Sequence, residues 1–504
     1  LLMKTIILGP PGTGKTTTLL DLVDQFIQQG VRPKEIGYFS FTKKAVNEAV
    51  SRAANKFNLD PKEDLKFFRT LHSFAFRLLG TNKEQMMSNR DYLEFGKKNG
   101  LVIKGTSYSE DDGIFNSDCE ELKIIERARI KGISLEDEYD MNEHLTDVER
   151  GTLILLDQEL KKYKKENGMK DFTDLIEDFI EEGNTPPFKV LFIDEAQDLN
   201  RLQWKMVRTI WKKSEKTYIA GDDDQAIFKW AGADIDHFIA LKNEVDEIKT
   251  LKQSYRIPGG PIHELSQRII KNVENRFDKS YKSKDEQGIL KYYSDVTQVD
   301  MSKGEWLVLS TAHHFLNDVK ELCELQGWYY QHRNKNSVDI GLLLAISNWE
   351  SWRKGSEFNH LEIKNMYSYL GENITPGFRD AKTLRSDTKY TLKECQQEHG
   401  LQVENVWFEA FDKLDPVTEN YIRNMRANGE KINRTPRILL STIHGAKGGE
   451  ADNVLIMSDL TIKAVKHKEK NPDDFHRLFY VAVTRPRKEL HIVDPRNYEK
   501  AYIL

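Results

Sequence analysis

Residues 4–18 hold the feature that most constrains what this chain can fold into, a glycine-rich loop between a short apolar run and a helix-like segment. The loop reads G-P-P-G-T-G-K-T from Gly9 to Thr16. It follows the apolar residues 5–8 and precedes a helical pattern over residues 17–26, which is the strand, loop and helix order of a phosphate-binding P-loop. An ordinary Gly-Pro turn is the alternative, and it is disfavoured because every position of the motif is filled in the right context.

The residues of this loop have complementary roles in binding a nucleotide phosphate. The glycines allow the backbone to aim its N–H groups inward, and the following helix adds the positive end of its dipole. Lys15 is expected to reach the β- and γ-phosphates, and the Thr16 hydroxyl to ligate Mg²⁺. The predicted nucleotide-binding residues of the segment are Gly9, Pro10, Pro11, Gly12, Thr13, Gly14, Lys15, Thr16 and Thr17.

Length and composition predict several globular domains. A chain of 504 residues, with 39% hydrophobic and 31% charged residues, is too long for a single core. The net charge of -5 means that a nucleic-acid surface must be a local basic path. The three cysteines lack metal-ligand spacing, and no apolar run approaches the roughly 18 residues of a membrane span. We therefore expect a cytoplasmic protein that does not contact a membrane.

Two βα units follow the P-loop. Residues 36–41 read as a buried strand before a polar helix, and residues 67–74 run from a strand into a helix. Aromatic and hydroxyl side chains stand at the carboxyl ends of both strands, where ligands bind in open α/β sheets. For each segment alone, a core role for the aromatic residues is equally favoured.

Helical periodicity dominates residues 80–183 and predicts an inserted helical domain, most clearly over residues 146–167. Lys161, Lys162, Lys164 and Lys165 crowd the end of that helix. They could grip phosphates, but a solvated helix face is the favoured interpretation.

The α/β pattern resumes with V-L-F-I-D-E-A-Q-D over residues 190–198, where apolar residues lead directly into two carboxylates. A buried strand of this kind delivers Asp194 and Glu195 to the sheet edge beside the phosphate loop. Asp194 is predicted to hold Mg²⁺, and Glu195 to orient and deprotonate the attacking water. A solvated acidic turn is the weaker alternative.

A further strand over residues 217–220 ends in G-D-D-D-Q, and Gln225 is placed to contact the γ-phosphate or the lytic water. Phe228 and Trp230 follow almost at once. Aromatic side chains beside a phosphate sensor can stack on bases and couple strand binding to the nucleotide state, although buried Phe and Trp are more often core.

Taken in order, these motifs resemble those of superfamily 1 helicases of the UvrD/Rep/PcrA group. G-P-P-G-T-G-K-T resembles motif I, F-S-F-T-K-K-A motif Ia, T-L-H-S-F motif Ib, D-E-A-Q-D motif II and G-D-D-D-Q-A-I-F-K-W-A-G-A-D motif III. The series continues with L-K-Q-S-Y-R at residues 251–256, W-L-V-L-S-T-A-H-H at 306–314, S-T-I-H-G-A-K-G-G-E at 441–450 and Y-V-A-V-T-R at 480–485.

The resemblance implies roles that the residues alone do not establish. Tyr255 would stack on adenine, Glu450 would contact the ribose, and Arg256 and Arg485 would be arginine fingers that reach the γ-phosphate. With Lys15, Asp194, Glu195 and Gln225, the two arginines complete the expected catalytic set. The implied nucleic-acid-binding residues are Phe41, Thr42, Thr70, His72, Ser73, Phe228, Trp230, His444 and Lys447.

The resemblance also implies the fold, an α/β chain with two RecA-like P-loop NTPase motor domains and helical accessory insertions. The first motor domain would comprise residues 1–80 and 184–250, with the helical accessory domain at 81–183. The second motor domain would comprise residues 251–335 and 436–504, with a reduced accessory domain at 336–435.

The implied function is an ATP-dependent DNA helicase or translocase that uses Mg²⁺ and moves on single-stranded DNA, 3′ to 5′. Its partners would be single-stranded DNA and single-strand/duplex junctions, and it would work as a monomer. A DNA-stimulated ATPase that remodels or signals without unwinding is the main alternative. The motor subunit of a helicase–nuclease complex is a weaker one, because no acidic nuclease motif or cysteine cluster follows Arg485.

Three features depart from the family pattern. No room precedes the P-loop for the adenine-reading glutamine of relatives, so base selectivity is expected to be loose. Ala231 stands where relatives usually have an arginine, and residues 333–435 are short for a second accessory domain. Residues 341–369 look helical, with Trp349, Trp352 and Leu361 as apolar positions, and residues 373–413 have no clear assignment.

Overall fold

The computed structural model describes residues 3–108, 114–142, 146–431 and 434–504. The chain divides into two compact units, one made of Leu1–Gly288 with Ile462–Thr484 and one made of Ile289–Thr461 with Arg485–Leu504. Within the described ranges, no helix has the length and apolar character that a membrane crossing requires.

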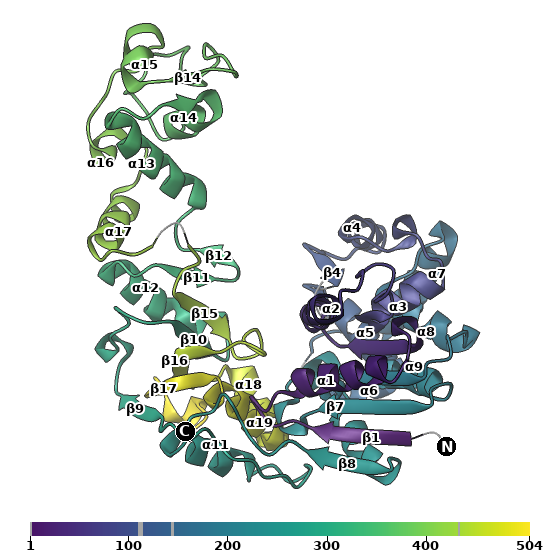
Figure 1. The fold of residues 1–504 in the computed structure, drawn as a ribbon. Coiled ribbons are helices and arrows are strands. Elements are labelled where there is room, and N and C mark those ends of the chain that lie inside the picture. The colour runs from purple at the N-terminus through teal and green to yellow at the C-terminus, as the bar shows by residue number, and fades with distance from the viewer. Residues whose placement is uncertain (1–2, 109–113, 143–145, 432–433) are drawn as a thin grey trace. The chain divides into compact units, whose positions relative to one another are not determined.

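The first unit is built on a six-stranded parallel sheet of order β3-β2-β6-β7-β1-β8. Strands distant in sequence therefore lie side by side, as β1, β7 and β8 do in Figure 1. The strands are β1 Met3–Leu8, β2 Ile36–Ser40, β3 Phe68–Thr70, β6 Val190–Asp194, β7 Lys216–Gly221 and β8 Glu247–Thr250. Their carboxyl ends meet at one edge, which is where ligands bind in sheets of this kind.

Both faces of this sheet are buried, because successive strand residues enter different cores. Ile6 and Leu8 belong to one apolar cluster and Ile7 to another. The helices α1 Lys15–Gln28 and α2 Lys43–Phe57 pack into the Ile7 cluster. The other cluster contains residues of α3 Leu71–Leu78, α9 Arg201–Trp211 and α10 Ile235–Ala240. The unit also includes α11 Pro261–Ile270, α18 Ile462–Lys470 and α19 Pro472–Val483.

The insertion between β3 and β6 is mainly helical, as predicted. It contains α4 Asn89–Lys98, α5 Glu120–Lys131, α6 Leu135–Asn142, α7 Arg150–Asn167 and α8 Phe172–Glu182, with a short hairpin of β4 Thr106–Tyr108 and β5 Phe115–Ser117. Residues of α4, α5 and α7 form a separate core that includes Phe95, Leu122 and Leu156. The long helix begins at Arg150, four residues later than the periodicity suggested.

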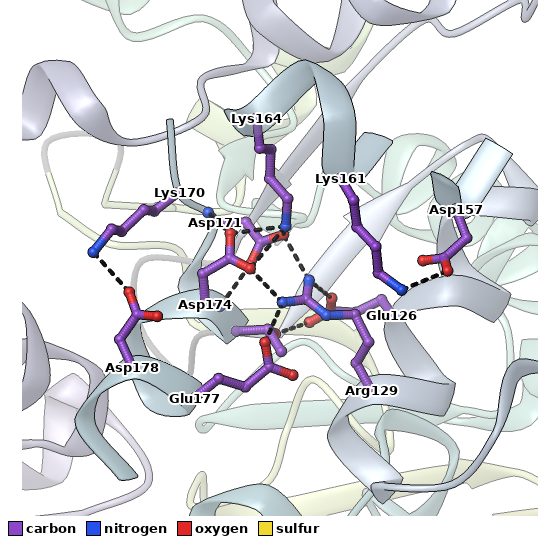
Figure 2. Close-up of polar contacts among 11 residues, drawn as sticks. Glu126, Arg129, Asp157, Lys161, Lys164, Lys170, Asp171, Asp174, Glu177 and Asp178 are labelled. Atoms are coloured by element: carbon purple, nitrogen blue, oxygen red, sulfur yellow. Dashed lines mark hydrogen bonds and ion pairs between the residues drawn. The ribbon is translucent and has the colours of Figure 1, made fainter. Parts of the chain in front are cut away.

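A buried ion cluster joins α5, α7 and α8 (Figure 2). Lys164 Nζ lies 2.7 Å from carboxylate oxygens of both Asp171 and Asp174, and the Arg129 guanidinium pairs with the same two residues at 2.7 and 2.6 Å. The prediction of a solvated face is therefore wrong for Lys164, whose side chain is only 9% exposed. The exposed Lys161 instead pairs with Asp157 at 2.7 Å.

The second unit is built on a seven-stranded sheet of order β12-β11-β15-β10-β16-β17-β9, parallel except for the β11–β12 pair. The strands are β9 Ile289–Tyr293, β10 Trp306–Ser310, β11 Tyr330–His332, β12 Lys335–Asn336, β15 Ile438–Thr442, β16 Ala451–Met457 and β17 Pro486–Val493. The two mainly parallel sheets confirm the predicted α/β class.

The same unit carries α12 Asn317–Gln326, α13 Ile340–Arg353, α14 His360–Tyr367, α15 Leu392–Glu398, α16 Trp407–Ala410 and α17 Pro416–Ala427. Two-residue strands β13 Phe358–Asn359 and β14 Lys389–Tyr390 pair with each other. Of the three apolar positions noted in the sequence, Trp349 and Trp352 are buried, whereas Leu361 is 64% exposed. Residues 373–413, unassigned from sequence, contain mostly short elements and turns.

The grouping of segments differs from the boundaries expected from the sequence. Residues 251–288 and 462–484 belong to the first compact unit, whereas they were expected in the second motor domain. These segments contact the loops at the carboxyl edge of the first sheet, which accounts for the grouping. Assignment of the two segments to a motor domain stays a prediction.

Candidate functional site

The phosphate loop leaves the sheet at the end of β1 and enters α1 directly. Gly9 donates its N–H to the Gly221 carbonyl at 3.0 Å, which fixes the start of the loop at the end of β7. Gly12 and Gly14 have φ angles of 72° and 79°, a left-handed conformation that favours glycine. Gly14 is the N-cap of α1, and among the described residues no side chain caps this helix end. The first backbone N–H groups of α1 can therefore face an anion.

Lys15 is the first residue of α1, and its side chain folds back over the loop. A Cβ atom on Gly9 would overlap the methylenes of Lys15, so this glycine makes room for the lysine. The Lys15 Nζ lies 3.7 Å from Glu195 Oε1. Burial alone would lower the Lys15 pKa, but the carboxylates of Glu195 and Asp222 outweigh burial and raise it. Lys15 therefore carries its positive charge at neutral pH.

Asp194 ends β6 and is fully buried, with hydroxyl donors on two sides. Its Oδ2 accepts hydrogen bonds from the Thr16 hydroxyl at 3.1 Å and from the Tyr38 hydroxyl at 2.8 Å. Burial, together with the neighbouring Glu195 carboxylate, raises the pKa of Asp194 to about 6. Ser40, which pairs with Asp194 across β2 and β6, has a buried hydroxyl without a hydrogen-bond partner in the described part of the chain. These oxygens fit a hard cation such as Mg²⁺, which prefers oxygen ligands.

Glu195 follows Asp194 in a left-handed conformation, with a φ of 53°. This region is rarely occupied by residues other than glycine, and such outliers persist where the surrounding structure fixes them. The Gln197 amide supplies part of that support, because its Nε2 donates to Glu195 Oε2 at 2.6 Å. The acid pair therefore has its side chains held by specific hydrogen bonds.

Gln225 lies in a 3₁₀ turn, Asp223–Gln225, that follows β7. Its Nε2 donates to Asp222 Oδ2 at 2.7 Å. The Asp222 N–H in turn donates to Gln197 Oε1 at 3.0 Å, so the turn after β7 is tied to the turn after β6. The structure thus brings Lys15, Asp194, Glu195 and Gln225 together at the sheet edge, through hydrogen bonds and the Lys15–Glu195 ion pair.

Residues 254–256 lie directly on the phosphate loop. The Ser254 hydroxyl donates to the Pro11 carbonyl at 2.8 Å, and the Tyr255 N–H donates to the Gly12 carbonyl at 2.8 Å. A Cβ atom on Gly12 would overlap the Arg256 side chain. Tyr255 is 74% exposed, which leaves its ring accessible for stacking on a planar ligand.

The remaining residues expected to contact the nucleotide or the nucleic acid lie in the second unit. The Arg485 guanidinium donates to the Gly449 carbonyl at 3.4 Å. Glu450 pairs with Arg487 at 3.4 Å. His444 and Lys447 lie in the turn after β15, where the Lys447 N–H donates to the His444 carbonyl at 3.3 Å. Their roles toward nucleotide and nucleic acid stay predictions.

A cavity of about 600 Å³ opens beside the turns that follow β2, β6 and β7, with the helical insertion as its other wall. Four residues expected to bind nucleic acid line it, namely Phe41, His72, Phe228 and Trp230. The Phe41 and Phe228 rings lie 5.9 Å apart, and the Phe228 and Trp230 rings 6.3 Å apart. Trp230 is 51% exposed, whereas both phenylalanines are less than 9% exposed. The tryptophan is therefore the ring best placed for stacking on a base.

The hydroxyl groups that are expected to contact nucleic acid also stabilise the local structure. The Thr42 and Thr70 hydroxyls cap α2 and α3 by accepting from Ala45 and Ser73 N–H groups, at 3.1 and 3.3 Å. Such caps stabilise a helix by about 1 kcal/mol. The Ser73 hydroxyl accepts from Arg69 at 3.2 Å.

Two more residues expected in the site, His72 and Thr17, have their own local contacts. Burial lowers the pKa of His72 to about 4, so this histidine lines the cavity in its neutral form. The Thr17 hydroxyl accepts from Arg52 at 3.0 Å and so links the start of α1 to α2.

Sequence reasoning missed several side chains that support the site. Tyr38 holds Asp194, Gln197 holds Glu195, and Lys279 contacts the acidic turn before Gln225. The run of three aspartates at 222–224 was a signal that cations must lie nearby, but it did not indicate which ones.

Two family models match the sequence of this chain. The sequence model of the UvrD/REP helicase N-terminal domain matches residues 2–246, and that of the UvrD-like helicase C-terminal domain matches residues 173–496, more than half of the chain. The chain belongs to the UvrD-like helicase family. The predicted architecture of two RecA-like motor domains agrees with this membership.

Curated relatives of this UvrD-like chain include ATP-dependent DNA helicase PcrA of Bacillus subtilis, 25% identical over 388 residues, with 72% of this chain and 50% of the relative covered. PcrA of Staphylococcus aureus strain Mu50 is 24% identical over 388 residues, with 72% and 51% covered. The chain thus spans about half the length of the curated relatives it matches. The solved structure titled "The structure of PRRSV helicase" aligns at a TM-score of 0.32 and 13% identity, covering 98% of this chain and 53% of that one.

The close contact between Gly12 and Arg256 gives a test of the phosphate loop of this UvrD-like chain. Gly12→Ala should lower affinity for a fluorescent ADP analogue at least about tenfold, because the added methyl displaces residues 254–256. Gly30→Ala is the matched control, since Gly30 also has a positive φ, of 89°, but has open space around its Cβ position. Both variants should lose about 1 kcal/mol of stability from backbone strain. Equal affinities in a fluorescence titration would contradict the assignment.

Proposed function

We propose that this chain is an ATP-dependent helicase or translocase that moves on single-stranded DNA and binds single-strand/duplex junctions. The proposal is supported chiefly by one arrangement. The turn after β6 contributes Glu195 beside Lys15 of the phosphate loop and Asp198 to the wall of the aromatic cavity. This short turn thus connects the phosphate loop, where the triphosphate is proposed to bind, to the aromatic cavity, where bases are proposed to stack.

In this proposal Lys15 and the N terminus of α1 bind the β- and γ-phosphates, and Tyr255 stacks on adenine. Thr16 and Asp194 would hold Mg²⁺, which supplies charge neutralisation of the phosphates when bound. Glu195 orients and deprotonates the attacking water, and Gln225 contacts that water or the γ-phosphate. Arg256 and Arg485 stabilise the charge that develops on the phosphoryl group, and Glu450 contacts the ribose.

Binding of the nucleic acid is proposed to combine stacking with backbone contacts. Trp230, Phe228 and Phe41 provide ring surfaces, and His444 and Lys447 contribute contacts from the second unit. Stacking tolerates any base, so we expect little sequence preference, and phosphate contacts should make binding sensitive to salt. ATP binding and loss of the γ-phosphate would alternately strengthen and weaken these contacts. We propose that the motor works as a monomer.

Strand displacement tests the function most directly. The chain should release the labelled strand of a duplex with a 3′ single-stranded tail in the presence of ATP and Mg²⁺, and should act weakly on a duplex with a 5′ tail. Preference for the 5′ tail would overturn the proposed direction. DNA-stimulated hydrolysis without strand release on either substrate would favour an ATPase that remodels or signals.

Replacement of the proposed general base separates binding from chemistry. Glu195→Gln keeps the shape and a hydrogen-bonding side chain but removes the group that accepts the proton from water. Turnover should fall by about 10²- to 10⁴-fold, whereas affinity for ATP should stay within about twofold. A coupled-enzyme assay and an equilibrium titration measure the two quantities. Unchanged turnover would remove Glu195 from the role of base.

The exposed tryptophan in the cavity gives a test of coupling to nucleic acid. Trp230→Ala should reduce DNA-stimulated hydrolysis about tenfold or more, because stacking on one base contributes about 1–3 kcal/mol, and should leave hydrolysis without DNA nearly unchanged. Tyr292→Ala is the control, since Tyr292 is an aromatic residue of similar exposure, 53%, and does not line the cavity. Equal losses with and without DNA would assign Trp230 a structural role and contradict its proposed role in binding nucleic acid.

A further inference from the structure

Three consecutive aspartates, Asp222–Asp224, are buried immediately before the proposed sensor Gln225. Each is at most 1% exposed. The Lys279 side chain is also only 1% exposed, and its Nζ lies 3.2, 2.5 and 2.8 Å from carboxylate oxygens of Asp222, Asp223 and Asp224, in that order. One ammonium group thus lies among three carboxylates that would otherwise repel one another in a desolvated turn.

Neighbouring residues complete the contacts of this turn. Arg276 bonds both oxygens of Asp224, at 2.8 and 2.5 Å, and the Phe277 N–H donates to Asp223 Oδ2 at 2.9 Å. From α19, Arg477 donates to the Asp223 carbonyl at 2.8 Å. Segments from two other parts of the chain therefore fix the backbone and the carboxylates of one turn. These contacts also explain why residues 275–279 and α19 group with the first sheet.

A short path of hydrogen bonds leads from Lys279 to the proposed catalytic groups. Asp222 contacts Lys279 on one side and accepts from Gln225 Nε2 at 2.7 Å. The Asp222 N–H donates to Gln197, and Gln197 donates to Glu195. The position of Asp222 consequently sets the orientation of the Gln225 amide and supports the Gln197 amide that holds Glu195.

We propose that Lys279 is a positioning residue of the ATP site, which acts by holding Asp222 in place to orient Gln225 and, through Gln197, Glu195. The inference rests on the function proposed above. Among the described residues, the ion-pair partners of Lys279 are the three aspartates and not the phosphate loop, so Lys279 is not placed as a catalytic residue. Its loss should therefore slow the chemical step more than it weakens ATP binding.

A second buried lysine provides a matched control. Lys164 lies between Asp171 and Asp174 at 2.7 Å from each, in the ion cluster of Figure 2, and its side chain is 9% exposed. It resembles Lys279 in burial and in pairing with several carboxylates. Its partners are the residue before α8 and a residue within α8, and they make no hydrogen bond among the described contacts to Glu195, Gln197 or Gln225.

The test compares Lys279→Met with Lys164→Met in the full chain, with DNA present. Both changes remove one buried cation from a group of carboxylates and should lower the melting temperature. Only Lys279→Met should reduce kcat about tenfold or more, with the KM for ATP within about threefold of the wild type. Assays are run well below both melting temperatures. Equal kcat values for the two variants would show that Lys279 is structural only.

A double variant keeps the test decisive if Lys279→Met folds poorly. Adding Asp223→Asn removes one uncompensated charge but leaves Asp222, so the melting temperature should recover in part while kcat stays low. Recovery of kcat together with the melting temperature would overturn the positioning role. If the wild-type protein has no DNA-stimulated ATPase activity, the proposed function itself is overturned. If the wild type is active and the Lys279→Met variant is equally active, only the positioning role of Lys279 is overturned.

Discussion

The ion pair between Lys15 and Glu195 is the interaction on which the rest of the site depends. It brings the first residue of α1 against the turn after β6, at the edge where the parallel strands end. Asp194, Asp198 and Asp222 also act on Lys15 electrostatically and keep it charged despite its burial. A triphosphate would add negative charge at this edge, and in the proposed mechanism Lys15 exchanges Glu195 for phosphate oxygens when a nucleotide binds. That exchange would release Glu195 to face water.

The turn after β6 joins the two proposed binding sites through a single amide. Gln197 Nε2 donates both to Glu195 and to Asp198, at 2.6 and 3.1 Å, and its Oε1 accepts from the Asp222 N–H. Glu195 faces the phosphate loop, whereas Asp198 lines the aromatic cavity. A change in the contacts of Glu195 can therefore shift the cavity wall through directly bonded groups, without motion of a distant element.

The sequence was informative where local patterns determine structure. The P-loop, the apolar strand leading into Asp194 and the segment before Gln225 each depend on a few consecutive residues, and their sheet edge follows from the topology of parallel strands. The prediction failed for Lys164, because a lysine on a helix reads as solvated unless its carboxylate partners on the next helix are known. Tyr38, Gln197 and Lys279 were missed because their importance arises from partners in other segments, brought close only by the fold.

A structure of the chain with a non-hydrolysable ATP analogue and Mg²⁺ tests the central claim most directly. The proposed mechanism predicts that Lys15 Nζ leaves Glu195 and contacts the β- and γ-phosphates, with Mg²⁺ between Thr16, Asp194 and the phosphates and the adenine on the Tyr255 ring. A nucleotide bound away from residues 9–17, or one that leaves the Lys15–Glu195 pair intact, would contradict it.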